Sequence, residues 1–173
     1  MRNATLTVAL LAVSAVAGAA PPAETEPVRA IAVIRNGAGA QVGTATLAED
    51  EEGVRIAIVV KGLPPGRHGF NLHTGGRCDA PDFTTTGAHF NPGNKGHGKA
   101  GSPEAHAGDL PDLVADAEGT ALVGFIVRGV GLGGGPASLL GGAGTALVVS
   151  AAADPGGTKA DVKRLACGVV TRR

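Results

Sequence analysis

The histidines of this chain gather in one short part of the sequence. All five lie between residues 68 and 106. Three of them, His89, His97 and His106, fall in a stretch with little hydrophobic periodicity, and Asp109 follows closely. Three imidazoles and one carboxylate complete the four-coordinate shell that zinc takes in structural sites. The pattern therefore predicts a structural zinc site that orders this loop, with solvated, metal-free histidines as the alternative.

Two further polar residues lie just before this stretch. Asn71 and His73 are separated by one residue, so on a strand their side chains point to the same face. His68 is an odd number of residues away from Asn71 and His73, so on the same strand its side chain would point to the opposite face. We expect it to be a packed or hydrogen-bonded histidine rather than a metal ligand.

The elements that must position these residues are short strands. Alternating or apolar runs separated by turns such as Asn36-Gly37 and Gly62–Gly66 predict an all-β antiparallel sandwich or barrel. About eight strands are expected, at 28–35, 41–47, 54–60, 68–73, 110–115, 120–127, 145–150 and 165–170. The segment 74–109 is an unusually long loop for such a domain, and loops of that length are usually functional.

The N-terminus indicates the compartment. Arg2, a short apolar stretch from Leu6 to Ala17 and the small-residue site Ala17-Gly18-Ala19 predict a secretory signal peptide at residues 1–20. The stretch is shorter than the roughly 20 residues that span a bilayer. We expect a flexible mature terminus at 21–27, a single domain at 28–173, no membrane span in the mature chain, and a periplasmic or extracellular location.

Composition excludes some partners. The chain has 173 residues, 15 basic and 15 acidic side chains, four Phe and neither Trp nor Tyr. A formal net charge of zero and so few stacking side chains argue against nucleic-acid binding. Cys78 and Cys167 are the only cysteines. In an oxidising compartment they could form one disulfide, and two buried free thiols are the alternative.

Five short sequence segments together resemble the copper/zinc superoxide dismutase family. GFNLH at 69–73 resembles its copper-binding strand, and RLACG at 164–168 resembles its C-terminal motif. GAHFNP at 87–92, with HG at 97–98 and HAGDL at 106–110, resembles its zinc loop. The resemblance covers about residues 28–170 and implies an eight-stranded Greek-key β-barrel with long metal-binding loops. It also implies a Cys78–Cys167 disulfide that joins the zinc loop to the last strand.

The resemblance assigns roles to individual residues. It implies that His89, His97, His106 and Asp109 bind zinc, and that His89 also contacts copper together with His73. Arg164 matches the arginine that attracts and orients superoxide. Asp154 matches the outer aspartate that links ligand histidines of the two metal sites.

Two copper positions depart from the family pattern. The family has histidines where this chain has Asn71 and Ser150, so His73 and His89 are the two remaining copper imidazoles. Cu(II) favours a nitrogen-rich tetragonal shell, and amide and hydroxyl oxygens are poorer donors for it. Zinc has no redox chemistry and cannot replace copper in a one-electron cycle.

Three functions follow from these residues. The first is a zinc-binding family member in which dismutation of superoxide to O₂ and H₂O₂ is weak or lost. The second is a working, slow superoxide dismutase that uses Arg164, His73 and His89. The third is transient carriage of Cu(I) by His73 and His89. The resemblance to the family is also compatible with a homodimer.

Overall fold

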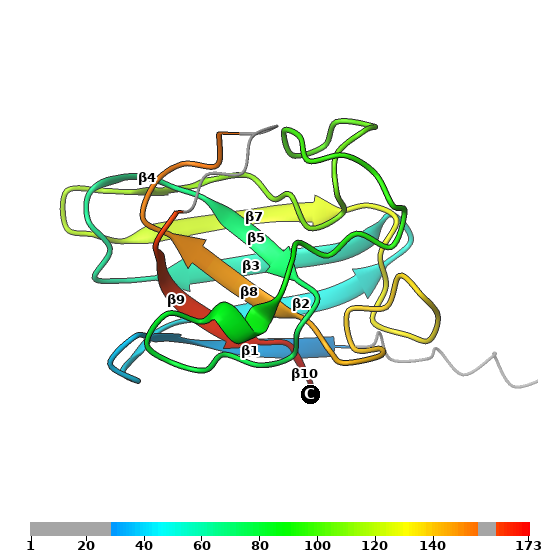
Figure 1. The fold of residues 1–173 in the computed structure, drawn as a ribbon, viewed down its shortest axis with the longest axis horizontal. Helices are drawn as coiled ribbons and strands as arrows, with labels where there is room; N and C mark the ends of the chain where they lie inside the picture. Colours follow the sequence, from blue (N-terminus) through cyan, green and yellow to red (C-terminus); the bar gives the residue numbers. More distant parts are fainter. Residues whose placement is uncertain (1–28, 156–161) are drawn as a thin grey trace, which may run out of the picture.

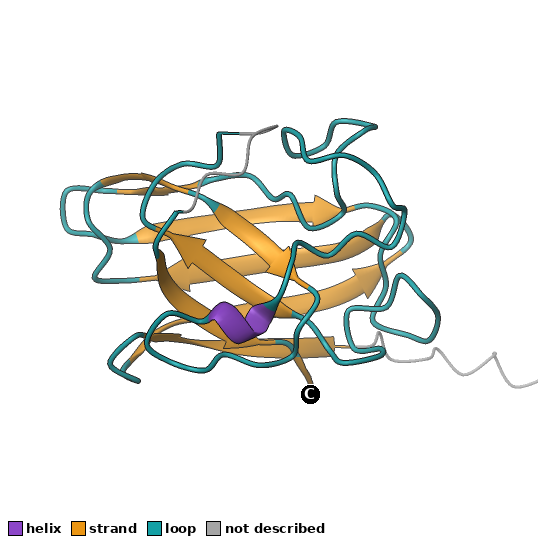
Figure 2. Cartoon of the chain, in the orientation of Figure 1, coloured by secondary structure: helices purple, strands orange, loops and turns teal. Residues whose placement is uncertain are grey.

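The computed structural model describes residues 29–155 and 162–173, and their structure is almost entirely antiparallel sheet (Figure 1). Within these residues the single helical turn is η1, drawn in purple in Figure 2. The predicted signal peptide (1–20) and flexible terminus (21–27) lie outside the described residues. The elements in chain order are β1 (Arg29–Asn36), β2 (Gln41–Asp50), β3 (Gly53–Val60), β4 (Gly66–His68), β5 (Phe70–His73), η1 (Thr84–Thr86), β6 (Leu113–Ala115), β7 (Ala121–Val127), β8 (Ala146–Ser150), β9 (Arg164–Val169) and β10 (Thr171–Arg172).

The strands follow one another around a curled sheet. Hydrogen-bonded neighbours run in the order β5-β8-β9-β1-β2-β3-β7, with β10 also paired to β1, and β4 paired to β6. Gly69 alone separates β4 from β5, and a backbone hydrogen bond from Asp116 N to Thr120 O closes the turn between β6 and β7. The path from β7 through β6 and β4 therefore returns to β5. The chain crosses over between β3 and β4 and between β7 and β8, which is a Greek-key connectivity.

The predicted fold class is confirmed, with two local differences in the strands. The strand expected at 68–73 is interrupted at Gly69, whose N–H donates to Ala152 O at 2.7 Å and whose carbonyl accepts from Ser150 N at 2.9 Å. The strand expected from 110 begins only at Leu113. Pro111 precedes it and has no N–H to donate to a ladder. Counting β4 with β5 and β9 with β10 gives the eight strands expected.

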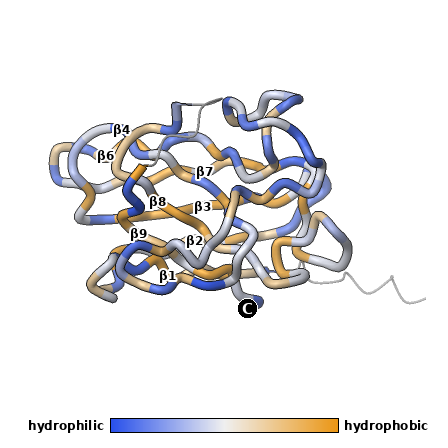
Figure 3. The backbone as a smooth tube through the Cα atoms, viewed as in Figure 1, coloured by the Kyte–Doolittle hydropathy of each residue, from blue (hydrophilic) through white to orange (hydrophobic). Residues whose placement is uncertain are grey.

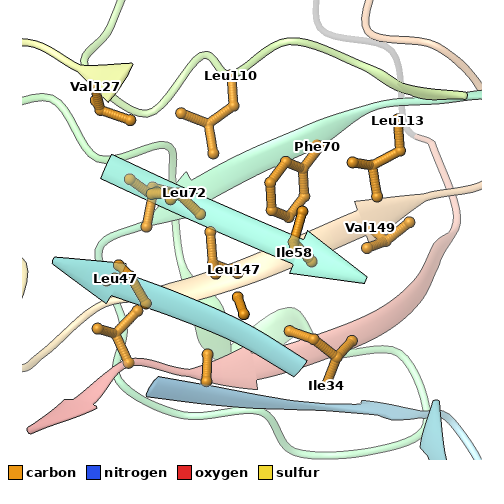
Figure 4. Close-up of a cluster of buried hydrophobic side chains, with 14 of the residues drawn as sticks. Ile34, Leu47, Ile58, Phe70, Leu72, Leu110, Leu113, Val127, Leu147 and Val149 are labelled. Atoms are coloured by element: carbon orange, nitrogen blue, oxygen red, sulfur yellow. The ribbon is translucent and has the colours of Figure 1, made fainter. Parts of the chain in front are cut away.

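The core lies inside the curled sheet because the strands alternate in hydrophobicity. In β3, Val54, Ile56, Ile58 and Val60 are buried, whereas Arg55 between them is exposed. Side chains from opposite strands meet in the interior, as Figure 4 shows for Phe70, Leu72, Leu147 and Val149 facing Ile34, Leu47 and Ile58. Hydrophobic colouring accordingly follows β3 and β8 in Figure 3, and hydrophilic colouring gathers in the loops around them.

A second, smaller cluster covers the outer face of β8. All of β8 except Ser150 is buried. Leu147 and Val149 face the main core, whereas Ala146 and Val148 pack outward against Phe83 and Cys167. Cys167 forms a disulfide with Cys78, with Cα atoms 5.7 Å apart, so the predicted disulfide is confirmed. The disulfide and Phe83 together hold the loop after β5 against the sheet.

No helix in the described part of the chain is long and apolar enough to cross a membrane.

Candidate metal centre

Two segments of the long loop lie against β5 and complete its hydrogen bonding. Leu72 N donates to Gly108 O at 2.9 Å, Gly108 N donates to Phe90 O at 2.8 Å, and Phe90 N donates to Leu72 O at 2.8 Å. The same pairing sets His73 opposite His89 and Asn71 opposite Asp109. Gly108 is required for this close approach, since a Cβ atom there would lie 2.4 Å from Leu72 O. The loop therefore carries its histidines to the face on which β5 presents Asn71 and His73.

Three imidazoles surround one carboxylate oxygen. The Nδ1 atoms of His89, His97 and His106 lie 2.7, 3.0 and 3.2 Å from Oδ1 of Asp109. All four candidate ligand atoms are within 4.8 Å of one another. Adjacent ligands in a tetrahedral zinc site are roughly 3.3 Å apart, given Zn–N bonds of about 2.0–2.1 Å. The residues present therefore fit a zinc ion with small adjustments.

The Asp109 carboxylate is held in place by the backbone as well as by the histidines. Its Oδ2 accepts hydrogen bonds from the N–H groups of Gly98 and His106, each at 3.0 Å. Burial acts to raise the pKa of Asp109. The hydrogen bonds from His89 and from these amides, with the charge of His97, outweigh burial and hold the pKa well below its usual range. Asp109 is thus an ionised candidate ligand in a fixed orientation.

A second carboxylate determines the tautomer of His97. Asp154 Oδ1 lies 2.8 Å from Nε2 of His97, and an ionised carboxylate only accepts, so this nitrogen carries the proton. The other ring nitrogen of His97, Nδ1, faces the Asp109 oxygen at 3.0 Å, an arrangement that calls for a proton or a metal ion between them. Burial acts to lower the pKa of His97, but the hydrogen bond with Asp154 and the charges of Asp109 and Asp154 raise it overall.

The same Asp154 carboxylate reaches β5. Its Oδ2 accepts a hydrogen bond from the side-chain amide of Asn71 at 2.9 Å. The backbone N–H of Asp154 donates to Asp112 Oδ1 at 3.1 Å, and Asp112 pairs with Arg67 at 3.0 Å. Asp154 therefore connects β5 to His97.

Next to the His/Asp cluster lies an open cleft of about 1140 Å³ that contains the other predicted site residues. Asn71, His73, Ser150 and Arg164 all line it. The His73 and His89 rings lie with centroids 4.9 Å apart at 70°. His73 Nδ1 donates to Gly87 O at 2.8 Å, which leaves Nε2 as the unprotonated nitrogen. Burial, more than any other cause, lowers the pKa of His73 from 6.5 to about 4, so it is neutral at physiological pH.

Arg164 lines the cleft, and its guanidinium group is also hydrogen-bonded to the loop that follows β5. One guanidinium nitrogen donates to Phe83 O at 2.6 Å and to Thr86 Oγ1 at 2.8 Å. The buried Thr86 hydroxyl donates in turn to Phe83 O at 3.0 Å and lies 3.3 Å from His73 Nδ1. Arg164, Thr86 and His73 thus form one connected group.

Some of these residues were not identified from the sequence. Nothing in the sequence distinguishes Thr86 from the neighbouring Thr84 and Thr85, and Asp112 resembles any loop carboxylate. Their roles depend on contacts with residues far away in the chain. His68, by contrast, lies where it was expected. It is 2% exposed, and its two ring nitrogens lie 2.9 Å from Ser150 O and 2.7 Å from Pro64 O.

The fold and the His/Asp cluster define a class of protein, namely Greek-key β-barrels that carry a cluster of candidate metal ligands on a disulfide-anchored loop. The model for the family described as copper/zinc superoxide dismutase (SODC) matches residues 41–170. Superoxide dismutase [Cu-Zn] 2 of Aquifex aeolicus is 37% identical over 153 residues, covering 84% of this chain and 88% of the relative. The chain belongs to the copper/zinc superoxide dismutase family.

Three further proteins are similar to this chain over most of its length. An extracellular superoxide dismutase [Cu-Zn] of Brugia pahangi is 36% identical over 158 residues, covering 84% of this chain and 77% of the relative. The crystal structure of a SOD-like protein from Bacillus subtilis is 34% identical with a TM-score of 0.73, covering 82% of this chain and 97% of that one. A crystal structure of a double mutant of a SOD-like protein from Bacillus subtilis, with two residues changed to histidine, is 35% identical with a TM-score of 0.73, covering 80% and 95%.

Proposed function

We propose that this protein binds zinc through His89, His97, His106 and Asp109, and that its capacity to dismutate superoxide is weak or lost. The observation that carries the zinc half is the convergence of three Nδ1 atoms on one buried carboxylate oxygen. The tautomer of His97 supports it, because the hydrogen bond to Asp154 leaves Nδ1 free to bind a metal. Bound zinc would cross-link a loop that has little apolar surface of its own to bury.

The proposal that dismutation is weak or lost rests on the atoms that are available to bind copper. His73 and His89 offer imidazoles, but the Asn71 amide nitrogen is engaged in its hydrogen bond to Asp154. Asn71 and Ser150 could offer only neutral oxygens. This set does not fit Cu(II), which prefers several nitrogen ligands in a tetragonal arrangement. These donors therefore do not support a catalytic step at copper.

A working but slow dismutase is the second candidate. The observation that favours it is that Arg164 lines the same cleft as His73 and His89. In this case superoxide would enter the cleft and be held by the Arg164 guanidinium. Activity would then require His73, and His73→Ala would abolish it.

We also propose export from the cytoplasm after removal of residues 1–20. The signal-like N-terminus, the Cys78–Cys167 disulfide and the likeness to a relative named as extracellular support this. N-terminal sequencing of the exported protein tests it, with a mature start near Pro21 expected. Export without processing would contradict the proposal.

The decisive experiment measures metal content and superoxide dismutation on the same sample of purified mature protein after loading with zinc and copper. We expect about one zinc per chain and no activity above that of free copper, as the four-ligand site implies. Copper-dependent activity at a substantial rate would support the second candidate instead. Asn71→His combined with Ser150→His is the matched variant, and we expect it to gain copper affinity because both positions line the cleft.

A further inference from the structure

We infer that Asn71 is a positioning residue for zinc. Its side chain is a poor ligand for copper, but it helps to orient a ligand of the neighbouring zinc site. The inference rests on the zinc half of the proposed function and adds a determinant of metal specificity to it. It assigns different roles to the two positions at which the copper pattern fails, Asn71 and Ser150.

The side chain of Asn71 is part of a continuous hydrogen-bonded connection to a zinc ligand. Its amide N–H donates to one oxygen of Asp154 at 2.9 Å, and the other oxygen of that carboxylate accepts from His97 Nε2 at 2.8 Å. Nδ1 of His97 is the atom that faces the Asp109 oxygen, at 3.0 Å. The orientation of the Asp154 carboxylate, and with it the ring plane and tautomer of His97, thus depends partly on Asn71.

The backbone of Asn71 supports the same site. Asn71 forms an antiparallel bridge with Asp109, the carboxylate ligand, and the next residue on β5 donates its N–H to Gly108 O at 2.9 Å. Asn71 is 4% exposed. It is thus a buried residue that borders the zinc cluster through its main chain and its side chain together.

An asparagine suits this position for a physical reason. A buried carboxylate needs N–H donors, and an amide supplies one without adding charge. A histidine can supply a similar donor from its ring, whereas leucine supplies none and aspartate would set a second negative charge against Asp154. The replacement at position 71 therefore removes a copper imidazole while it keeps the donor that the zinc side requires.

Ser150 differs in its contacts. Among the described residues, its hydrogen bonds involve the backbone, with its N–H donating to Gly69 O at 2.9 Å and its carbonyl lying 2.9 Å from His68 Nδ1. No link from the Ser150 side chain leads to Asp154 or to His97 in this part of the chain. Ser150→Ala is therefore the control for a change at a lost copper position.

The test compares zinc affinity, by competition with a chromophoric chelator, in the full mature protein and four variants. We expect Asn71→Leu and Asn71→Asp to bind the first zinc equivalent about tenfold or more weakly, the usual effect of removing a group that orients a metal ligand. Asn71→His should restore affinity to within about threefold of the parent, and Ser150→Ala should also remain within about threefold. The visible spectrum of the Co²⁺-loaded protein should change in Asn71→Leu and be unchanged in Ser150→Ala.

The outcomes separate this inference from the proposed function. If the unaltered protein binds no zinc, the proposed function and the inference fail together. If it binds zinc and Asn71→Leu binds it equally well, the inference alone is wrong. Denaturant unfolding of each metal-free variant detects a general loss of structure. A zinc defect in Asn71→Leu that Asn71→His does not rescue, or one that Ser150→Ala shares, would also overturn the inference.

Discussion

Gly108→Ala should separate β5 from both loop segments that carry the candidate zinc ligands. The added methyl group would lie 2.4 Å from Leu72 O and 2.7 Å from Phe90 N. Carbon atoms do not approach backbone atoms that closely, so the loop must move away from β5 by several tenths of an ångström or more. The glycine is required here because β5 and the segment at Phe90 leave no space for a side chain.

The magnitude follows from the hydrogen bonds that cross this contact. Three backbone bonds connect Leu72, Phe90 and Gly108, each at 2.8 or 2.9 Å. A buried hydrogen bond contributes about 0.5–1.5 kcal/mol net, so their disruption should lower the free energy of unfolding by about 2–4 kcal/mol. Zinc affinity should fall as well, because Asp109 follows Gly108 directly.

The assay is urea unfolding of the metal-free protein, followed by zinc titration. Gly134→Ala is the matched control, since a methyl group there would meet nothing within 4 Å. The control should unfold like the parent protein. If Gly108→Ala also unfolds within about 0.5 kcal/mol of the parent, the contact between β5 and the loop is looser than described, and the steric argument is refuted.

Three further predictions concern the surroundings of the site. Cys78→Ala removes a disulfide that spans 89 residues, and the chain-entropy model predicts a loss of about 4–5 kcal/mol in denaturant unfolding under oxidising conditions; equal stability of variant and parent would contradict it. Because the pKa of His73 falls from 6.5 to about 4 on folding, the contribution of His73 to the stability of the metal-free protein should be complete above pH 6.5 and be lost as the pH falls to 4. The loss should reach about 3 kcal/mol and shrink in His73→Gln, as unfolding curves measured at several pH values would show. Thr86→Val deprives Arg164 of a buried acceptor and should cost about 1–3 kcal/mol in thermal unfolding, whereas Thr86→Ser should be close to the parent; equal losses would indicate packing alone.

The strands could be predicted because local pattern determines them. In β3 the alternation of Val54, Ile56, Ile58 and Val60 identifies both the strand and its inner face. The bounds of β4 to β6 are harder to predict from the sequence. The interruption at Gly69 depends on contacts with Ala152 and Ser150, which lie far away in the sequence.

In the candidate site, too, some residues could be predicted from the sequence and others could not. Residue types and motif resemblance were enough to select His89, His97, His106 and Asp109, which the structure brings together. The resemblance also pointed to Asp154, which contacts His97, but the other residues that hold the site in place were not found. Thr86 and Asp112 act through partners about 80 and 40 residues away in sequence, and the partnership of Asn71 with Asp154 spans 83 residues. Such contacts arise only when the barrel closes.

The candidate zinc ligands all lie on one continuous segment, 89–109, whereas the positions expected for copper are divided among β5, that segment and β8. The four candidate zinc ligands are therefore inherited together on one segment. A substitution on a strand removes none of them. The second set depends on distant strands that mutate independently, so it can be eroded one residue at a time. Within one fold the two halves of a bimetallic centre can thus evolve at different rates. To graft a metal-binding loop onto another barrel, one would transplant the 89–109 segment together with its contact to β5.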